Sequence, residues 1–180
     1  MFGGIGHDSF VHDESVSVRC ADERDAVVLA ELHRSTALYA YAKIFPPDAP
    51  PPELAPLIDD WIARIWPSRP SEQACFVAAD RDEIVGVVIA GPAPGERSVG
   101  HLSRLYVDPG HWSRGIGRLL HDNAIAHLRE HNFRSGTLWV LEANVRARRF
   151  YEQLGWRPTS GRLTTYAPGG IDDVGYQRLL

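Results

Sequence analysis

The sequence has two cysteines, one lysine and no long apolar run, and these shortages limit the classes of protein to which it can belong. Cys20 and Cys75 lie far apart and form no metal-binding or redox motif, so we expect two reduced thiols in a cytoplasmic protein. No apolar stretch approaches the roughly 20 residues that a membrane-spanning helix needs, and the first residues lack the pattern of a secretory signal. Lys43 is the one lysine among 19 basic residues, so a single arginine carries little information here.

Length and charge favour a soluble globular domain. The chain has 180 residues, of which 44% are hydrophobic and 23% are charged, and its formal net charge is −4. A chain of this size can bury a core without disulfides or metal. The mild acidity argues against a nucleic-acid partner, because phosphate contacts usually need a basic face. We expect residues 1–14 to form a flexible segment ahead of one domain over residues 15–180.

Hydrophobic periodicity predicts the order β-α-α-β-β-β-α-β-α-β-β, a mixed α/β domain. Strands are expected at residues 15–20, 74–79, 84–90, 99–107 and 137–141, with two more around a turn at Pro168, Gly169 and Gly170. Helices are expected at residues 22–38, 53–65, 115–131 and 144–154. The first helix should bury Val27, Leu29, Leu32 and Leu38, and residues 91–95 should form a loop.

The stretch that carries most chemistry is residues 105–120, in which a strand runs through a glycine-containing loop into a helix. The first turn of a helix leaves backbone amides without partners and adds partial positive charge, so it attracts anions. Gly115 and Gly117 would let a diphosphate approach closely, and Arg114 and Arg118 would add full positive charge. The motif is neither a P-loop nor a dinucleotide fingerprint. A tight turn that binds nothing stays the alternative.

A second pattern follows at residues 139–156, where an Asn ends a strand and a Phe-Tyr pair precedes a glycine. Together the two stretches resemble the GCN5-related N-acetyltransferase (GNAT) superfamily, with its motifs Gln/Arg-x-x-Gly-x-Gly/Ala and Asn-x-x-Ala-x-x-Phe-Tyr-x-x-x-Gly-Phe. Trp112 replaces Gln or Arg in the first motif, and Trp156 replaces Phe in the second. The second motif is otherwise met by Asn144, Ala147, Phe150, Tyr151 and Gly155. The resemblance implies a mostly antiparallel central sheet flanked by helices and an N-acetyltransferase domain.

The resemblance also implies an activity: transfer of an acetyl group from acetyl-coenzyme A (acetyl-CoA) to a primary amine of a small molecule or polypeptide. Pantetheine would bind Asn144 and the backbone of Leu105, Tyr106 and Val107. The diphosphate would lie over the amides of Ser113, Arg114, Gly115, Ile116, Gly117 and Arg118. Tyr151 would bind the cofactor and protonate the leaving thiolate, unless it is only a core aromatic residue.

Three routes remain for removing the proton of the acceptor ammonium, whose pKa is about 10.4. His101 lies near the start of the fourth strand and has a suitable side chain, and Ser103 shares its face. Glu142, at the end of the fifth strand, is the second candidate, and a chain of water molecules is the third. His127 and His131 have a metal-binding spacing but no third ligand, so no metal is expected.

The acceptor and the assembly stay open at this stage. Tyr39, Tyr41 and Phe45 would shape an acceptor pocket, but loop residues of this kind do not identify a substrate. Many relatives form dimers, so a homodimer is an option. The alternative function is a non-catalytic acyl-CoA-binding sensor or interaction module, which would need the glycine loop and Asn144 but neither Tyr151 nor a base.

Overall fold

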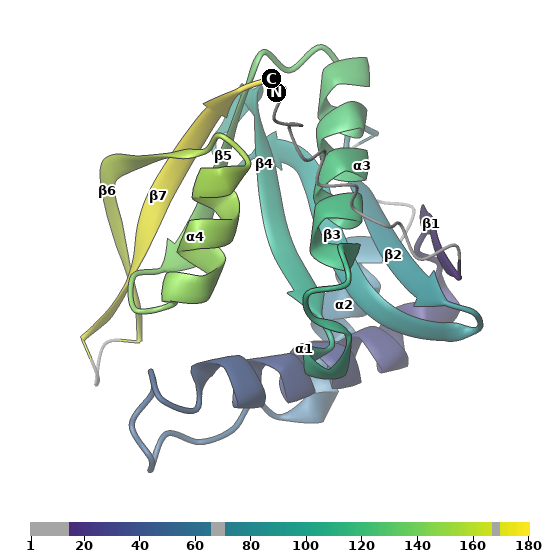
Figure 1. Cartoon of the computed structure of the whole chain (residues 1–180), viewed down its shortest axis with the longest axis vertical. Helices are drawn as coiled ribbons and strands as arrows, with labels where there is room; N and C mark the ends of the chain where they lie inside the picture. The colour runs from purple at the N-terminus through teal and green to yellow at the C-terminus, as the bar shows by residue number, and fades with distance from the viewer. Residues whose placement is uncertain (1–14, 66–70, 167–169) are drawn as a thin grey trace, which may run out of the picture.

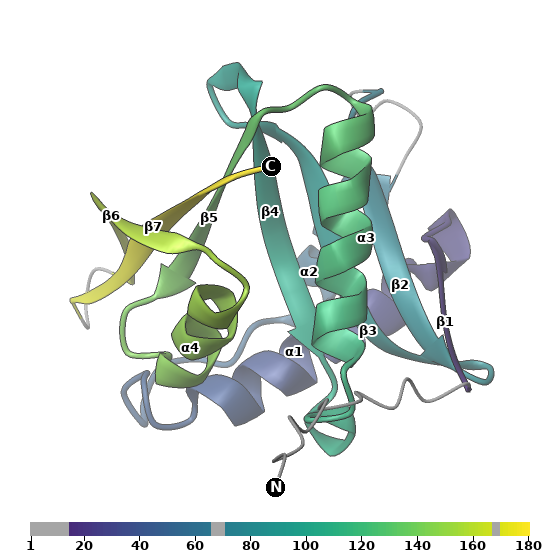
Figure 2. The same cartoon turned by 45° about the horizontal axis from the view of Figure 1, so that its top comes forward.

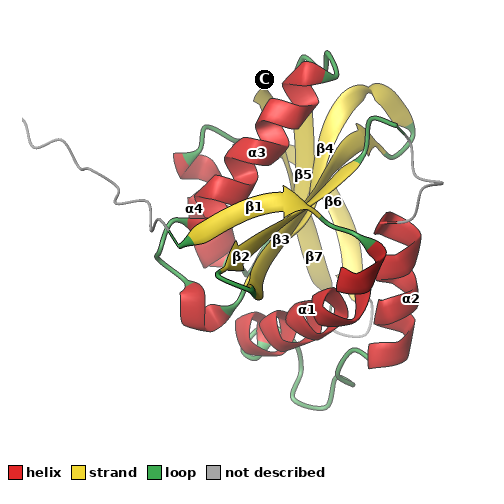
Figure 3. Cartoon of the chain, turned by 90° about the vertical axis from the view of Figure 1, so that its right-hand side faces the viewer, coloured by secondary structure: helices red, strands yellow, loops and turns green. Residues whose placement is uncertain are grey.

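A seven-stranded sheet runs through the molecule and carries two helices on each face (Figures 1 and 3). The computed structural model describes residues 15–65, 71–166 and 170–180. The strand order is β1-β2-β3-β4-β5-β7-β6, and only the β4–β5 pair is parallel among the described strands. The prediction of a mixed, mostly antiparallel sheet flanked by helices is therefore confirmed. Residues 1–14, Pro168 and Gly169 lie outside the described residues, so the predicted flexible segment and domain boundary stay predictions.

The elements follow the predicted order. The strands are β1 (Val16–Cys20), β2 (Ala74–Asp80), β3 (Glu83–Ala93), β4 (Glu96–Val107), β5 (Ser135–Leu141), β6 (Arg157–Tyr166) and β7 (Ile171–Leu179). The helices are α1 (Ala26–Tyr41), α2 (Leu54–Ile65), α3 (Ile116–Glu130) and α4 (Val145–Gln153), with short 3-10 turns at Glu23–Asp25 and Pro109–His111. Figure 3 shows α3 and α4 on one side of the sheet and α1 and α2 on the other, so the sheet separates two hydrophobic cores.

The buried face of α1 differs from the predicted one. Val27 and Leu38 are 48% and 46% exposed, whereas Leu29, Ala30 and Leu32 are buried. A helix turns about 100° per residue, and the core-facing stripe runs through positions 26, 29, 30 and 37. Val27 and Leu38 fall on its flanks, so that part of the prediction is wrong.

The predicted loop at residues 91–95 is also wrong. Strand β3 continues to Ala93 and β4 begins at Glu96, which leaves a tight turn at Pro94 and Gly95. Pro92 is accommodated because the strand register shifts beside it, and Gly95 adopts the positive φ of 78° that this turn requires. Cross-strand pairing thus overrides the local proline signal.

The β4–β5 pair is short, and this positions the site. Only Gly100 with Gly136 and His101 with Thr137 are in register. Beyond them the two strands separate toward the ends from which α3 and α4 begin, as Figure 2 shows. A bulge bends β4 at the same point: the register passes from Ile89–Ser103 to Val87–Tyr106, and Arg104 takes a left-handed φ of 54°.

Candidate active site

The separation of β4 and β5 leaves one backbone edge of β4 without a strand partner among the described residues. That edge covers residues 102–107 and includes Leu105, Tyr106 and Val107, the predicted pantetheine contacts. An unpaired strand edge offers alternating donors and acceptors, which suits an extended ligand with amide groups. These three residues therefore lie on the edge of β4 beyond its pairing with β5.

The loop from β4 into α3 forms a concave backbone surface. Ser113 and Gly115 both have positive φ, of 65° and 84°, and the first backbone hydrogen bond of α3 runs from Leu119 N to Gly115 O at 3.0 Å. The amides before Leu119 therefore have no intrahelical acceptor. Nothing lies within 4 Å of the place where a Cβ of Gly115 would stand, so the surface is open to an anion.

Gly117 lies in the first turn of α3, on the side that faces α4. A Cβ at this position would contact the Phe150 ring, at 3.5 Å, and not the open side of the loop. A small side chain would therefore make an ordinary van der Waals contact with α4 at this position. Of the two glycines, Gly115 at the N-cap of α3 faces open space.

The two predicted arginines of the loop already have acidic neighbours. Arg114 pairs with Asp80 at 2.9 Å, and Arg118 lies 3.7 Å from Asp122. Trp112 anchors the loop, because its indole N–H donates to the carbonyl of Val107 at 2.7 Å. This indole replaces the usual polar side chain of the motif and ties the loop to the end of β4.

Asn144 caps α4. Its side-chain oxygen accepts a hydrogen bond from the amide of Ala147 at 3.1 Å, which explains why an Asn starts this helix. No described residue accepts a hydrogen bond from its NH₂ group. That group remains able to donate to a ligand in the cleft.

Tyr151 is buried, 9% exposed, and packs against Phe150 and Trp156 with ring centroids 5.2 and 6.3 Å away. Burial raises the pKa of Tyr151, with a smaller contribution from Tyr106, so the hydroxyl keeps its proton at neutral pH. No described residue shares a hydrogen bond with this hydroxyl. The side chain is therefore in the right protonation state to act as an acid.

His101 is held in one tautomer. Its Nδ1 lies 3.1 Å from the Thr137 hydroxyl, which itself donates to the carbonyl of Gly100 at 3.3 Å. The hydroxyl must then accept from Nδ1–H, and this leaves the lone pair on Nε2, which no described residue contacts by hydrogen bond. Burial lowers the pKa of His101, so the neutral base dominates at pH 7.

Glu142, the second predicted base, lies in a different environment. Half of its side chain is exposed, and its carboxylate lies 3.3 Å from Arg162 of β6. Glu142 Oε1 thus already accepts a hydrogen bond from Arg162, whereas Nε2 of His101 has no hydrogen bond to a described residue. Among the two candidate side chains, the local geometry favours His101.

A half-buried polar cluster on the α1 side of β4 has no counterpart among the sequence predictions. Arg104 contacts His33 Nδ1 at 3.2 Å and Asp60 at 3.0 Å, and His33 Nε2 lies 3.0 Å from the Tyr106 hydroxyl. A guanidinium only donates, so Nδ1 accepts and the His33 proton on Nε2 points to Tyr106. Burial, and next the charge of Arg104, lowers the pKa of His33 to about 4. Nothing in the sequence around a lone helical histidine signals this arrangement.

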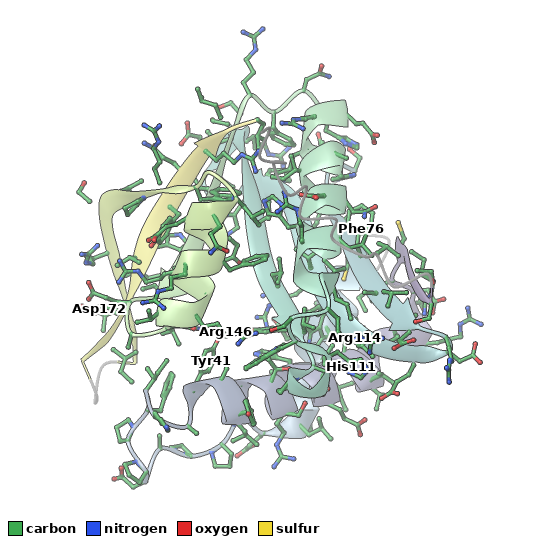
Figure 4. All side chains as sticks on the ribbon, in the orientation of Figure 1. Tyr41, Phe76, His111, Arg114, Arg146 and Asp172 are labelled. Carbon is green, nitrogen blue, oxygen red and sulfur yellow. The ribbon has the colours of Figure 1, made fainter. Side chains whose placement is uncertain are left out.

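Tyr41, at the end of α1, is one of the residues predicted near an acceptor pocket. Figure 4 shows its side chain close to the foot of α4. Burial raises the pKa of Tyr41, and so do the neighbouring Tyr106, Tyr151 and Asp173. Tyr41 is therefore within electrostatic range of these three groups. Tyr39 instead contacts the Trp112 ring, at 5.3 Å, and is 65% exposed.

The structure uses the two spaced histidines of α3 for packing. His127 Nε2 lies 2.8 Å from the carbonyl of Glu72, and His131 Nδ1 lies 2.9 Å from the carbonyl of His127. Within the described ranges, no group of three or more His, Cys, Asp or Glu side chains could hold a metal ion. None of the described helices is long and apolar enough to cross a membrane.

Comparison with known proteins gives consistent matches. The family described as "Acetyltransferase (GNAT) family" matches residues 35–156. An uncharacterized N-acetyltransferase of Archaeoglobus fulgidus is 32% identical over 100 residues, covering 48% of this chain and 68% of that protein.

Solved structures share the fold. The PaiA N-acetyltransferase of Thermoplasma acidophilum, in complex with coenzyme A, superposes with a TM-score of 0.74 over 92% of this chain and 99% of its own, at 18% identity. A ribosomal-protein-alanine N-acetyltransferase of Brucella melitensis gives a TM-score of 0.70 over 91% and 99%, at 21% identity. At these identities, the likeness concerns the fold alone.

Proposed function

This chain belongs to the GNAT acetyltransferase family and is an N-acetyltransferase with an amine acceptor. From this premise we propose that it binds acetyl-CoA between β4 and β5 and transfers the acetyl group directly to a primary amine. One observation carries the proposal: the unpaired edge of β4 leads straight into the amide-lined loop at residues 113–118. Bound acetyl-CoA supplies an activated thioester, and the residues of the chain bind it and move the protons.

Donor binding rests on the backbone. The loop amides and the dipole of α3 favour the diphosphate, the edge at residues 105–107 pairs with the pantetheine amides, and the Asn144 NH₂ group adds a donor. A backbone N–H of β4 would stabilise the negative charge that develops on the thioester oxygen.

The proton steps fall to two side chains. His101 Nε2 takes the proton of the acceptor ammonium, directly or through water, because the neutral imidazole exposes its lone pair there. Tyr151 gives its proton to the departing sulfur, since burial keeps the hydroxyl protonated. The two groups thus have opposite tasks and opposite protonation states.

The acceptor enters beside the tyrosines. Tyr41 and Tyr106 provide aromatic walls, and Asp173 supplies a negative charge that both hydroxyls sense. This environment favours a cationic amine on an apolar stem. We also propose that the protein is cytoplasmic, forms a homodimer and has no nucleic-acid partner.

An acceptor screen with acetyl-CoA tests the function. Candidate amines of increasing size, from polyamines and amino acids to peptides, are incubated with enzyme and acetyl-CoA. A gain of one acetyl group in the mass spectrum, together with release of coenzyme A, supports the proposal. Binding of acetyl-CoA without turnover on any amine would favour the sensor alternative.

A further inference from the structure

Trp112 and Arg146 meet across the cleft between β4 and β5. Trp112 belongs to the loop after β4, whereas Arg146 lies in the first turn of α4, after β5. The Arg146 guanidinium lies 4.1 Å from the centroid of the Trp112 ring. Figure 4 shows Arg146 between the foot of α4 and the loop that enters α3. The contact therefore joins the two sides of the site near the amide surface.

The indole is a fixed platform for this arginine. Its N–H is held by the Val107 carbonyl at 2.7 Å, and the Tyr39 ring packs edge-on at 5.3 Å. One turn after Arg146, Phe150 packs beside Gly117. Residues four apart share a helix face, so the α4 face with Arg146 looks toward the first turn of α3.

Arg146 also differs from the other arginines of the site. Arg114 and Arg118 have carboxylate neighbours, but Arg146 forms no ion pair with any described residue. Stacking occupies only the face of a guanidinium and leaves the N–H groups at its edge able to donate. A cation in the first turn of α4 is unfavourable for the helix dipole, so its placement needs another reason.

We propose that Arg146, positioned by Trp112, binds the diphosphate of coenzyme A from the α4 side while the loop amides bind it from the α3 side. The inference rests on the proposed binding of acetyl-CoA. It assigns the charged contact to a residue outside the glycine loop, and it gives the tryptophan in that loop a function. Arg146 is a binding residue, and Trp112 is a positioning residue.

The test measures the dissociation constants of three ligands. Coenzyme A carries a diphosphate and a separate ribose phosphate, dephospho-coenzyme A carries the diphosphate alone, and pantetheine carries no phosphate. Arg146→Gln should weaken coenzyme A and dephospho-coenzyme A by about tenfold, as expected for one charge-assisted contact, and leave pantetheine unchanged. Arg129→Gln removes the same charge at the opposite end of α3 and should change none of the three.

Trp112→Leu tests the positioning role. It should weaken coenzyme A binding, and the loss should be smaller when Arg146→Gln is already present, because part of the effect of the indole passes through the arginine. Full additivity of the two changes would contradict that role.

Failure of the inference is distinguishable from failure of the function. If the wild type binds no coenzyme A, the proposed function fails and the inference with it. If the wild type binds it and Arg146→Gln binds equally well, only the inference fails. Equal weakening of pantetheine, or a loss confined to coenzyme A and absent with dephospho-coenzyme A, would also overturn the diphosphate assignment.

Discussion

At the scale of single residues, burial sets the proton positions on which the chemistry depends. Tyr151 and His101 both lie in poorly solvated places, which disfavours the charged form of each. The tyrosine consequently stays an acid and the imidazole stays a base. The same physical cause thus prepares two groups for opposite tasks.

Tyr151→Phe should lower kcat by at least tenfold with little change in the dissociation constant of acetyl-CoA. The ring would still pack against Phe150 and Trp156, and only the proton donor would be lost. Steady-state kinetics and calorimetry measure the two quantities. An unchanged kcat would remove Tyr151 from the acid role.

His101→Gln should reduce kcat/KM by about a hundredfold, since a general base is lost. In the wild type, kcat/KM should fall only as the pH drops below 6.5, because burial lowers the pKa of His101 from that value. This acid limb should be absent from the variant. Glu142→Gln is the matched comparison, and a larger loss there would transfer the base role to Glu142.

At the scale of the element, the left-handed backbone of the loop aims its amides. Gly115 has a φ of 84° and open space around it, and Gly95, in the distant β3–β4 turn, has nearly the same conformation and surroundings. The two glycines are therefore a natural pair for separating strain from function.

Gly115→Ala and Gly95→Ala should each lower the free energy of unfolding by about 1 kcal/mol, the cost of a left-handed alanine. Only Gly115→Ala should also weaken coenzyme A, because relief of its strain turns the loop amides. Urea unfolding and calorimetry give both quantities. Equal coenzyme A affinity in the two variants would separate Gly115 from cofactor binding.

Local signals predicted the elements well and the contacts between them poorly. Glycines, proline stops and periodicity predicted the order of the described helices and strands along the chain, since these elements depend on neighbours in sequence. The bulge at Arg104 depends on how β3 and β4 pair, and the cluster around His33 joins residues 71 positions apart. No local pattern marks either feature. Trp156, a departure from the family motif, is explained only by the buried His121, whose Nε2 accepts its N–H at 3.0 Å.

At the scale of the whole molecule, the sheet separates a hydrophobic core under α3 and α4 from a second one under α1 and α2, and the polar cluster of His33, Asp60, Arg104 and Tyr106 lies on the second side. Within that cluster, His33 shares a hydrogen bond with Tyr106 on β4. It folds as a neutral base, because burial lowers its pKa from 6.5 to about 4. The stability of the fold should therefore depend on pH.

Proton linkage determines whether the free energy of unfolding rises or falls with pH. Below pH 6.5 the unfolded chain binds a proton at residue 33 more readily than the folded chain does, so stability falls as the pH drops toward about 4. His33→Gln should show a shallower loss over this window than the wild type, with other titrating groups common to both. Urea unfolding at several pH values measures it, and identical slopes would mean that His33 titrates normally in the fold.

Hydrogen–deuterium exchange with and without saturating coenzyme A tests the cofactor site most directly. We predict slower exchange in peptides that cover residues 105–118 and the start of α4, where unpaired amides would gain acceptors and the ligand would cover the backbone. Protection elsewhere, with residues 113–118 exchanging as fast as before, would contradict the assignment of this loop as the diphosphate site.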